Sequence, residues 1–172
     1  MQKIIQTIES AISNGDLYSP VYVVLALTDA CANKQYPEYG NGKAYCKWIE
    51  KFHTPKSKQK HSGLFIPEST MYKFRCSLLH SSSNDLEKNN KNLVSRIIVT
   101  NTDSHFNFSD TNGVKEIQVN VKLFVEEILD SIKIWQNDAE KNGINTECSF
   151  EVLNGCWSSQ EVNGAMAFKD CK

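Results

Sequence analysis

The chain has 172 residues, a formal net charge of -1 and six cysteines. A chain of this length buries roughly two-thirds of the surface that it exposes when unfolded, so it can fold as one domain without disulfides or metal ions. The near-zero charge excludes a general electrostatic attraction to nucleic acid or membranes, so an anion-binding surface has to be local. The sequence contains no run of about 18 apolar residues, and we expect a soluble, cytoplasmic protein that makes no membrane contact.

The first two predicted elements are helices. Gln2 to Ser13 carries isoleucines at helical spacing and ends at Asn14-Gly15, a typical C-terminal signal. The second helix begins at Ser19-Pro20 and runs to about Asn33. It is apolar on all sides, which predicts the central helix of the fold. Asp29 lies inside it, and a buried carboxylate needs a cationic or multi-donor partner.

A third helix is predicted from Lys43 to His53, with aromatic residues on one face that favour a place in the core. It leads into residues 51–63, the most basic segment of the chain, which shows no periodicity. We expect a loop there. It is either a solvated linker or a flap that contacts phosphate through Lys56, Lys58 and Lys60.

After a further helix that begins at Pro67-Glu68 and a polar stretch, the periodicity changes. Three short runs are typical of β-strands: Arg96–Thr100, His105–Phe108 and Val114–Val119. Asn112-Gly113 predicts a tight turn between the last two. These runs predict a small antiparallel sheet, inserted between helices at about 94–119. A long helix from Asn120 to Asn142 follows and ends at Gly143.

The tail contains a hairpin signal, made of the run 148–153, Asn154-Gly155 and Cys156-Trp157. The predicted fold is therefore mainly α: a helical bundle over 1–143 that carries the sheet insertion, followed by a C-terminal appendage over 144–172. The six cysteines never approach the C-x-x-C spacing of a zinc or redox site. We expect reduced thiols, with a disulfide among Cys148, Cys156 and Cys171 as the alternative, and neither a metal site nor a cofactor.

The helix that contains Tyr72 to His80 places an arginine unusually. On a helical wheel, Met71, Phe74 and Leu78 share one apolar arc, and Arg75 lies in the middle of it. An arginine directed into a core costs several kcal/mol unless a carboxylate, a phosphate or backbone carbonyls receive its donors. Asp29 is one possible partner, although this carboxylate could instead be hydrogen-bonded to tyrosine or backbone.

An arginine followed after four residues by a histidine at a helix end resembles the signature of HEPN domains. This family of small all-helical proteins includes many metal-independent RNases. The wider core Tyr72-x-x-Arg75-Cys76-x-x-x-His80 also resembles a group of uncharacterised bacterial HEPN-like proteins, and Asp29 and Trp48 fit that group. In catalytic members the residue after the arginine is often polar, whereas here it is a cysteine.

The resemblance implies RNA cleavage, in which a ribose 2′-OH attacks the adjacent phosphodiester, in a defence or toxin-like setting. His80 would move the proton, because imidazole titrates near neutral pH. Arg75 would stabilise charge on the phosphoryl oxygens. Catalytic relatives place two copies of the motif face to face, so a homodimer is implied.

Two other functions remain open. One is a non-catalytic binder that sequesters a nucleotide or cyclic oligonucleotide signal in defence or counter-defence. Its ligand-binding residues would be Asp29, Lys56, Lys58, Lys60, Tyr72, Lys73, Arg75 and His80. A short, isolated basic segment suits a small anion better than a duplex. The other is a structural or antitoxin-like dimerisation module without a ligand, in which Asp29 satisfies Arg75 and His80 is a helix-end histidine favoured by the dipole.

Overall fold

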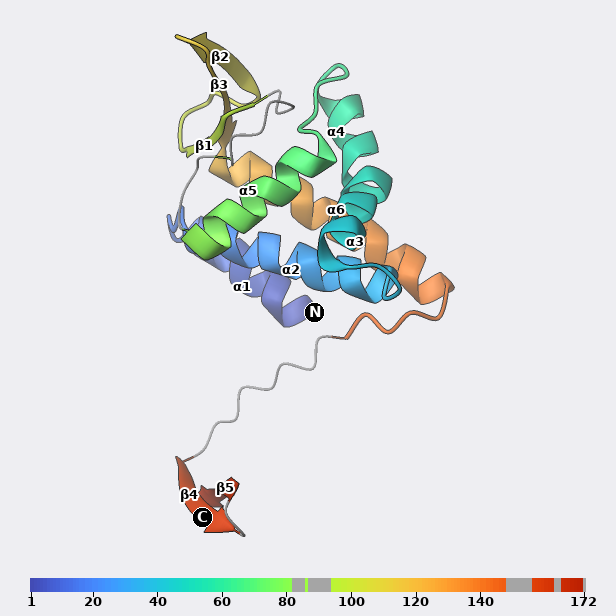
Figure 1. The fold of residues 1–172 in the computed structure, drawn as a ribbon, viewed down its shortest axis with the longest axis vertical. Coiled ribbons are helices and arrows are strands. Elements are labelled where there is room, and N and C mark those ends of the chain that lie inside the picture. Colours follow the sequence, from blue (N-terminus) through green and yellow to red (C-terminus); the bar gives the residue numbers. More distant parts are fainter. Residues whose placement is uncertain (82–85, 87–93, 148–155, 163–164, 172) are drawn as a thin grey trace.

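The computed structural model describes residues 1–81, 86, 94–147, 156–162 and 165–171, and this part of the chain is mainly helical, as predicted (Figure 1). The helices are α1 (Gln2–Ser13), α2 (Ser19–Gln35), α3 (Asn41–Trp48), the π-helical turn η1 (Ile49–His53), α4 (Thr54–Lys60), α5 (Glu68–Ser81) and α6 (Val121–Lys141). The strands are β1 (Arg96–Thr100), β2 (Asn107–Thr111), β3 (Val114–Asn120), β4 (Cys156–Val162) and β5 (Ala165–Cys171). Among these helices, none combines the length and the apolar character that a membrane span needs.

Helix α2 is the centre of the helical body, as its apolar sequence predicts. It contacts α1, α3, α5 and α6 (Figure 1). Val24, Leu25 and Cys31 of this helix are completely buried. Because α2 touches elements on several sides, a polar group in its interior, such as Asp29, has to find its partner on a neighbouring helix.

The basic segment after α3 is a helix and not the predicted loop. Helix α3 continues through η1 into α4, so residues 41–60 are helical throughout. A proline inside a regular helix removes one hydrogen bond and collides with the carbonyl four residues earlier. Pro55 is tolerated because it lies in the first turn of α4, directly after η1, where the Thr54 N–H donates to the carbonyl of Ile49, five residues before it.

The three-stranded sheet is mixed, which corrects the predicted antiparallel arrangement. Strand β3 is central and pairs antiparallel with β2, and Asn112 and Gly113 between them have φ values of 54° and 79°, as the predicted tight turn requires. Strand β1 pairs with the other edge of β3 in parallel, with Ile97 opposite Ile117. Residues 101–106 carry the chain from β1 to β2 at the opposite edge of the sheet. The alternation of apolar residues in the sequence does not predict this crossing.

Helix α6 follows β3 directly. Its first turn is capped by Asn120, whose side-chain oxygen accepts the N–H of Leu123 at 2.9 Å. The buried face of this helix includes Phe124, Ile128 and Trp135, which are all 2% exposed or less. Helix α6 therefore joins the sheet to the helical body.

The tail forms an antiparallel hairpin of β4 and β5, in which Cys156 pairs with Cys171 and Val162 with Ala165. This hairpin lies later in the chain than predicted, because the whole of Cys156–Val162 is its first strand. The run 148–153 and the turn Asn154-Gly155, on which the prediction depended, lie outside the described residues, as does most of the polar stretch after His80.

Candidate functional site

Arg75 and Asp29 form an ion pair between α5 and α2. Arg75 Nη2 donates to Asp29 Oδ2 at 2.9 Å, and both side chains are only 15% exposed. Asp29 is thus confirmed as the partner that the buried charge of Arg75 requires. The contact has a single hydrogen bond, so the carboxylate fixes one end of the guanidinium and leaves Nη1 directed elsewhere.

The other end of the guanidinium faces His80. Arg75 Nη1 lies 3.3 Å from His80 Nε2 and 3.8 Å from Cys76 Sγ. A guanidinium nitrogen only donates, so Nε2 must offer a lone pair, which places the proton of a neutral His80 on Nδ1. His80 is exposed at the end of α5. Asp29, Arg75 and His80 therefore form a hydrogen-bonded chain that leads from the centre of the protein to its surface.

Tyr72 covers the side of this chain toward α3. Its half-buried ring lies 5.7 Å from the ring of Tyr45, and a Cβ added at Gly42 would lie 3.0 Å from its ring carbons. A hydrogen bond with Cys76, helped by partial burial, raises the pKa of Tyr72. Lys73 is half-buried on α5 but is two positions from Arg75, and residues two apart do not share a helix face.

Several buried polar atoms around the ion pair have no hydrogen-bond partner among the described residues. They are Asp29 Oδ1, Arg75 Nε, the Tyr45 hydroxyl and Trp48 Nε1. Tyr45 and Trp48 are completely buried. Burial raises the pKa of Tyr45 well above its usual value, and the Asp29 carboxylate raises it further. Buried polar atoms are normally paired, so this region retains hydrogen-bonding capacity that the helices do not use.

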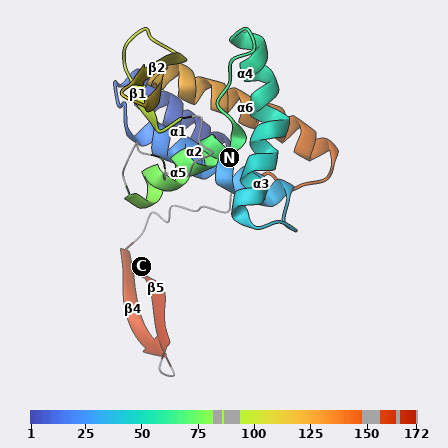
Figure 2. The ribbon, with the colours of Figure 1, turned by 45° about the horizontal axis from the view of Figure 1, so that its top comes forward.

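The three lysines of the predicted flap belong to α4 and turn toward other elements. Lys60 Nζ lies 2.9 Å from Glu127 Oε1 and Lys56 Nζ lies 3.4 Å from Asp130 Oδ2, so both lysines pair with α6. Figure 2 shows the course of the two helices. Lys58 Nζ lies 4.2 Å above the ring of Phe65. In the part of the chain that the structure describes, these lysines are therefore brought to α6 and to the segment before α5, and not to Arg75.

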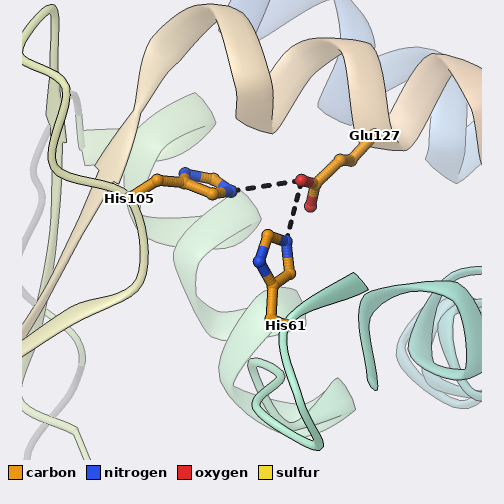
Figure 3. A group of neighbouring side chains, drawn as sticks. All are labelled: His61, His105 and Glu127. Carbon is orange, nitrogen blue, oxygen red and sulfur yellow. Dashed lines mark hydrogen bonds and ion pairs between the residues drawn. The ribbon is translucent and has the colours of Figure 1, made fainter. Parts of the chain in front are cut away.

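A second cluster joins α4, the segment before β2 and α6. Glu127 Oε1 lies 2.9 Å from His61 Nε2 and 3.2 Å from His105 Nε2, as Figure 3 shows. The Glu127 side chain is 9% exposed. Burial alone would raise its pKa, but hydrogen bonds from His105, Lys60 and His61 outweigh it and hold the pKa at about 2. Glu127 is therefore a buried, ionised carboxylate surrounded by nitrogen donors.

The backbone fixes the tautomer of His105. Its Nδ1 accepts the N–H of Asn120 at 3.1 Å, so a neutral His105 carries its proton on Nε2 and donates it to Glu127. The His61 ring packs 4.4 Å from the ring of Phe106, whose φ of 56° is rare for a bulky side chain. The segment before β2 thus adopts an uncommon backbone conformation where it places His105 over α6.

A cavity of about 310 Å³ lies beside this cluster, between one face of α4 and the Glu127 and Asp130 side chains of α6. His53 also lines it. His53 Nδ1 lies 3.1 Å from Ser131 Oγ, and burial lowers the pKa of His53 to about 4. The cavity is therefore surrounded by ionisable side chains, most of which are already paired.

Comparison with the models of known protein families, with curated proteins and with solved structures finds no match. The site therefore has to be interpreted from its own residues. Sequence reasoning identified Asp29, Arg75 and His80 but missed the second cluster. His61 and His105 lie 66 and 22 residues from Glu127. No local spacing connects them, and only the fold brings them together.

Proposed function

We propose that the chain is a metal-independent ribonuclease of the HEPN type, which cleaves RNA in a defence or toxin-like role through Arg75 and His80. The observation that carries this proposal is the guanidinium that Asp29 holds next to His80 Nε2. A fixed cation beside a base that can accept a proton is the minimum that metal-free phosphodiester cleavage needs.

Each group has a defined part in the reaction. His80 Nε2 takes the proton of the ribose 2′-OH as the bond from O2′ to phosphorus forms and the bond from phosphorus to O5′ breaks, and the departing 5′-oxygen takes a proton from water. Arg75 Nη1 donates to a phosphoryl oxygen and stabilises the charge that develops there. Before substrate binds, these two atoms face each other at 3.3 Å. A phosphate that takes the Nη1 hydrogen therefore releases the Nε2 lone pair for the proton.

The homodimer belongs to the same proposal. His80 is exposed, so the proton-transfer group is accessible to RNA or to a second copy of the chain. One copy supplies a single Arg75–His80 pair, and the HEPN-type arrangement brings two such pairs together around one phosphodiester. Sedimentation at increasing concentration, compared with the concentration dependence of cleavage, tests this part.

The test is cleavage of end-labelled single-stranded RNA in EDTA. The wild type should give products with 2′,3′-cyclic phosphate ends, and His80→Gln and Arg75→Leu should each reduce the rate by about a hundredfold or more. Lys122→Ala is the matched control, because Lys122 is an exposed lysine of α6 that pairs with Glu126 and has no part in the proposed site. Unchanged cleavage by both active-site variants, with folding confirmed by circular dichroism, would refute the proposal.

One observation favours the second candidate, a binder of a nucleotide or cyclic oligonucleotide. Arg75 is already paired with Asp29, and the half-buried Tyr72 ring lies on the same helix, so the region suits one phosphate and one stacked base better than a long strand. Nucleotides should then raise the melting temperature by mass action and return chemically unchanged. Tyr72→Ala should abolish this shift. No shift and no cleavage would leave only the dimerisation module.

A further inference from the structure

We propose that His61, His105 and Glu127 form a binding site for a divalent transition-metal ion of the Zn²⁺ type, which fastens the sheet insertion to the helical body. The three side chains come from the end of α4, the segment before β2 and the second turn of α6 (Figure 3). An ion held by all of them would therefore tie three separate elements together.

The positions of the ligand atoms fit a tetrahedral site. One ring nitrogen of each histidine and a carboxylate oxygen of Glu127 all lie within 4.8 Å of one another. His61 Nε2 and His105 Nε2 are 2.9 and 3.2 Å from Glu127 Oε1. In a tetrahedral zinc site with bonds of about 2.0–2.1 Å, ligand atoms are separated by about 3.3 Å. Small side-chain movements are enough to reach that spacing.

The ligand set also selects the kind of ion. Two imidazoles and one carboxylate suit Zn²⁺ and neighbouring first-row ions, whereas Mg²⁺ and Ca²⁺ prefer oxygen ligands. Three protein ligands leave one coordination position for water. Glu127 also lines the cavity of about 310 Å³ between α4 and α6, so the ion would lie at the wall of that cavity.

A cation already occupies part of this position. Lys60 Nζ lies 2.9 Å from the same Glu127 oxygen, and the Lys60 side chain is 52% exposed. A flexible, half-exposed ammonium can move into solvent at little cost when a divalent ion takes its place. When the ion is absent, Lys60 thus balances the negative charge of the buried Glu127 carboxylate.

The backbone hydrogen bond that His105 Nδ1 accepts from Asn120 lowers the expected affinity for the metal ion. With the metal on Nε2, a neutral His105 must carry its proton on Nδ1, where it now accepts the Asn120 N–H. That hydrogen bond has to break, which should weaken binding roughly 10- to 100-fold relative to a site without this penalty. We therefore expect a site that fills when metal is supplied and that empties with a chelator.

This inference does not depend on the proposed ribonuclease. In the described part of the chain, the polar contacts of the cluster run to Lys60 and Asn120 and do not include Arg75 or His80. Failure of one proposal therefore leaves the other in place. RNA cleavage in EDTA tests the first, and metal binding tests the second.

The experiment uses the full chain, stripped with EDTA, desalted and titrated with Zn²⁺ in a calorimeter. One ion per chain should bind and raise the melting temperature, and Mg²⁺ should do neither. His61→Gln and His105→Gln should each weaken Zn²⁺ binding at least tenfold, while His80→Gln, the matched control, should leave it unchanged. No stoichiometric binding by the wild type, or equal binding by both cluster variants, would overturn the proposal.

Two measurements on the wild type give the result without relying on variants, which could unfold, and distinguish the histidine site from metal binding by the six cysteines. Zn²⁺ should protect His61 and His105, but not His80, from modification by diethylpyrocarbonate, as read by mass spectrometry. Co²⁺ in the site should show visible ligand-field bands without a thiolate charge-transfer band. Absence of histidine protection, or a thiolate band, would place the ion elsewhere and refute the site.

Discussion

The ion pair between Asp29 and Arg75 can be tested by a double-mutant cycle. We would compare Asp29→Leu, Arg75→Leu and the double variant, because leucine removes each charge and keeps an apolar volume. Each single change leaves one charge buried without its partner. The double change removes both charges, together with the unpartnered Asp29 Oδ1 and Arg75 Nε atoms.

The expected magnitudes follow from the exposure and contacts of the pair. Breaking a buried ion pair costs about 3–5 kcal/mol, and a pair with one hydrogen bond and 15% exposure should lie at the lower end of this range. Arg75→Leu should cost about 3 kcal/mol, because the Asp29 carboxylate stays in the core. Asp29→Leu should cost less than this range, about 2 kcal/mol, because Arg75 retains its contact with exposed His80. The double variant should be within about 1 kcal/mol of the wild type.

Urea unfolding followed by circular dichroism gives the four free energies. A loss of 3 kcal/mol corresponds to a fall in melting temperature of about 6–12 °C for a chain of this size. With these values the cycle should show a coupling of about 4–6 kcal/mol. Additive losses in the double variant would mean that the two charges do not stabilise each other, and the ion pair could then not be what orients Arg75.

Three further outcomes can be checked by the same unfolding measurements. Tyr45→Phe should raise the free energy of unfolding by about 1 kcal/mol, since it removes a buried hydroxyl that lacks a partner; a loss would show that this hydroxyl is hydrogen-bonded. Gly42→Ala should lower the free energy of unfolding by about 1–3 kcal/mol, because the new methyl group would lie 3.0 Å from the Tyr72 ring. Gly40→Ser should be tolerated, because a Cβ added at Gly40 would have no neighbouring atom of the described residues within 4 Å. The pKa of His53 falls from 6.5 to about 4 on folding, so the unfolded chain binds more protons between these values. The wild type should therefore lose about 2 kcal/mol between pH 7 and pH 5 through this group, and His53→Gln should lose correspondingly less; equal losses in the two proteins would contradict this assignment.

The sequence alone determined the helices whose signals are local. Gln2–Ser13 was predicted with its observed bounds, and the long final helix within one residue at each end, because apolar spacing and the flanking turn residues act within a few residues of each boundary. The sequence also named Asp29 as a possible partner of Arg75, because a charge on a core-facing position of a helix requires an opposite charge. The structure decided between this pairing and an Asp29 bonded to tyrosine or backbone.

Only the tertiary structure decided three other features. Residues 54–60 are helical because Pro55 falls in the first turn of α4, where proline is tolerated, and because Thr54 and Ser57 are buried against the body, which the run of lysines does not predict. Strand β1 is parallel to β3 because alternating residues define the faces of a strand but not the direction of its neighbour. His61, His105 and Glu127 meet because β3 leads directly into α6, which brings α6 against both the end of α4 and the segment before β2. Such a meeting depends on the packing of whole elements, so no spacing along the chain encodes it.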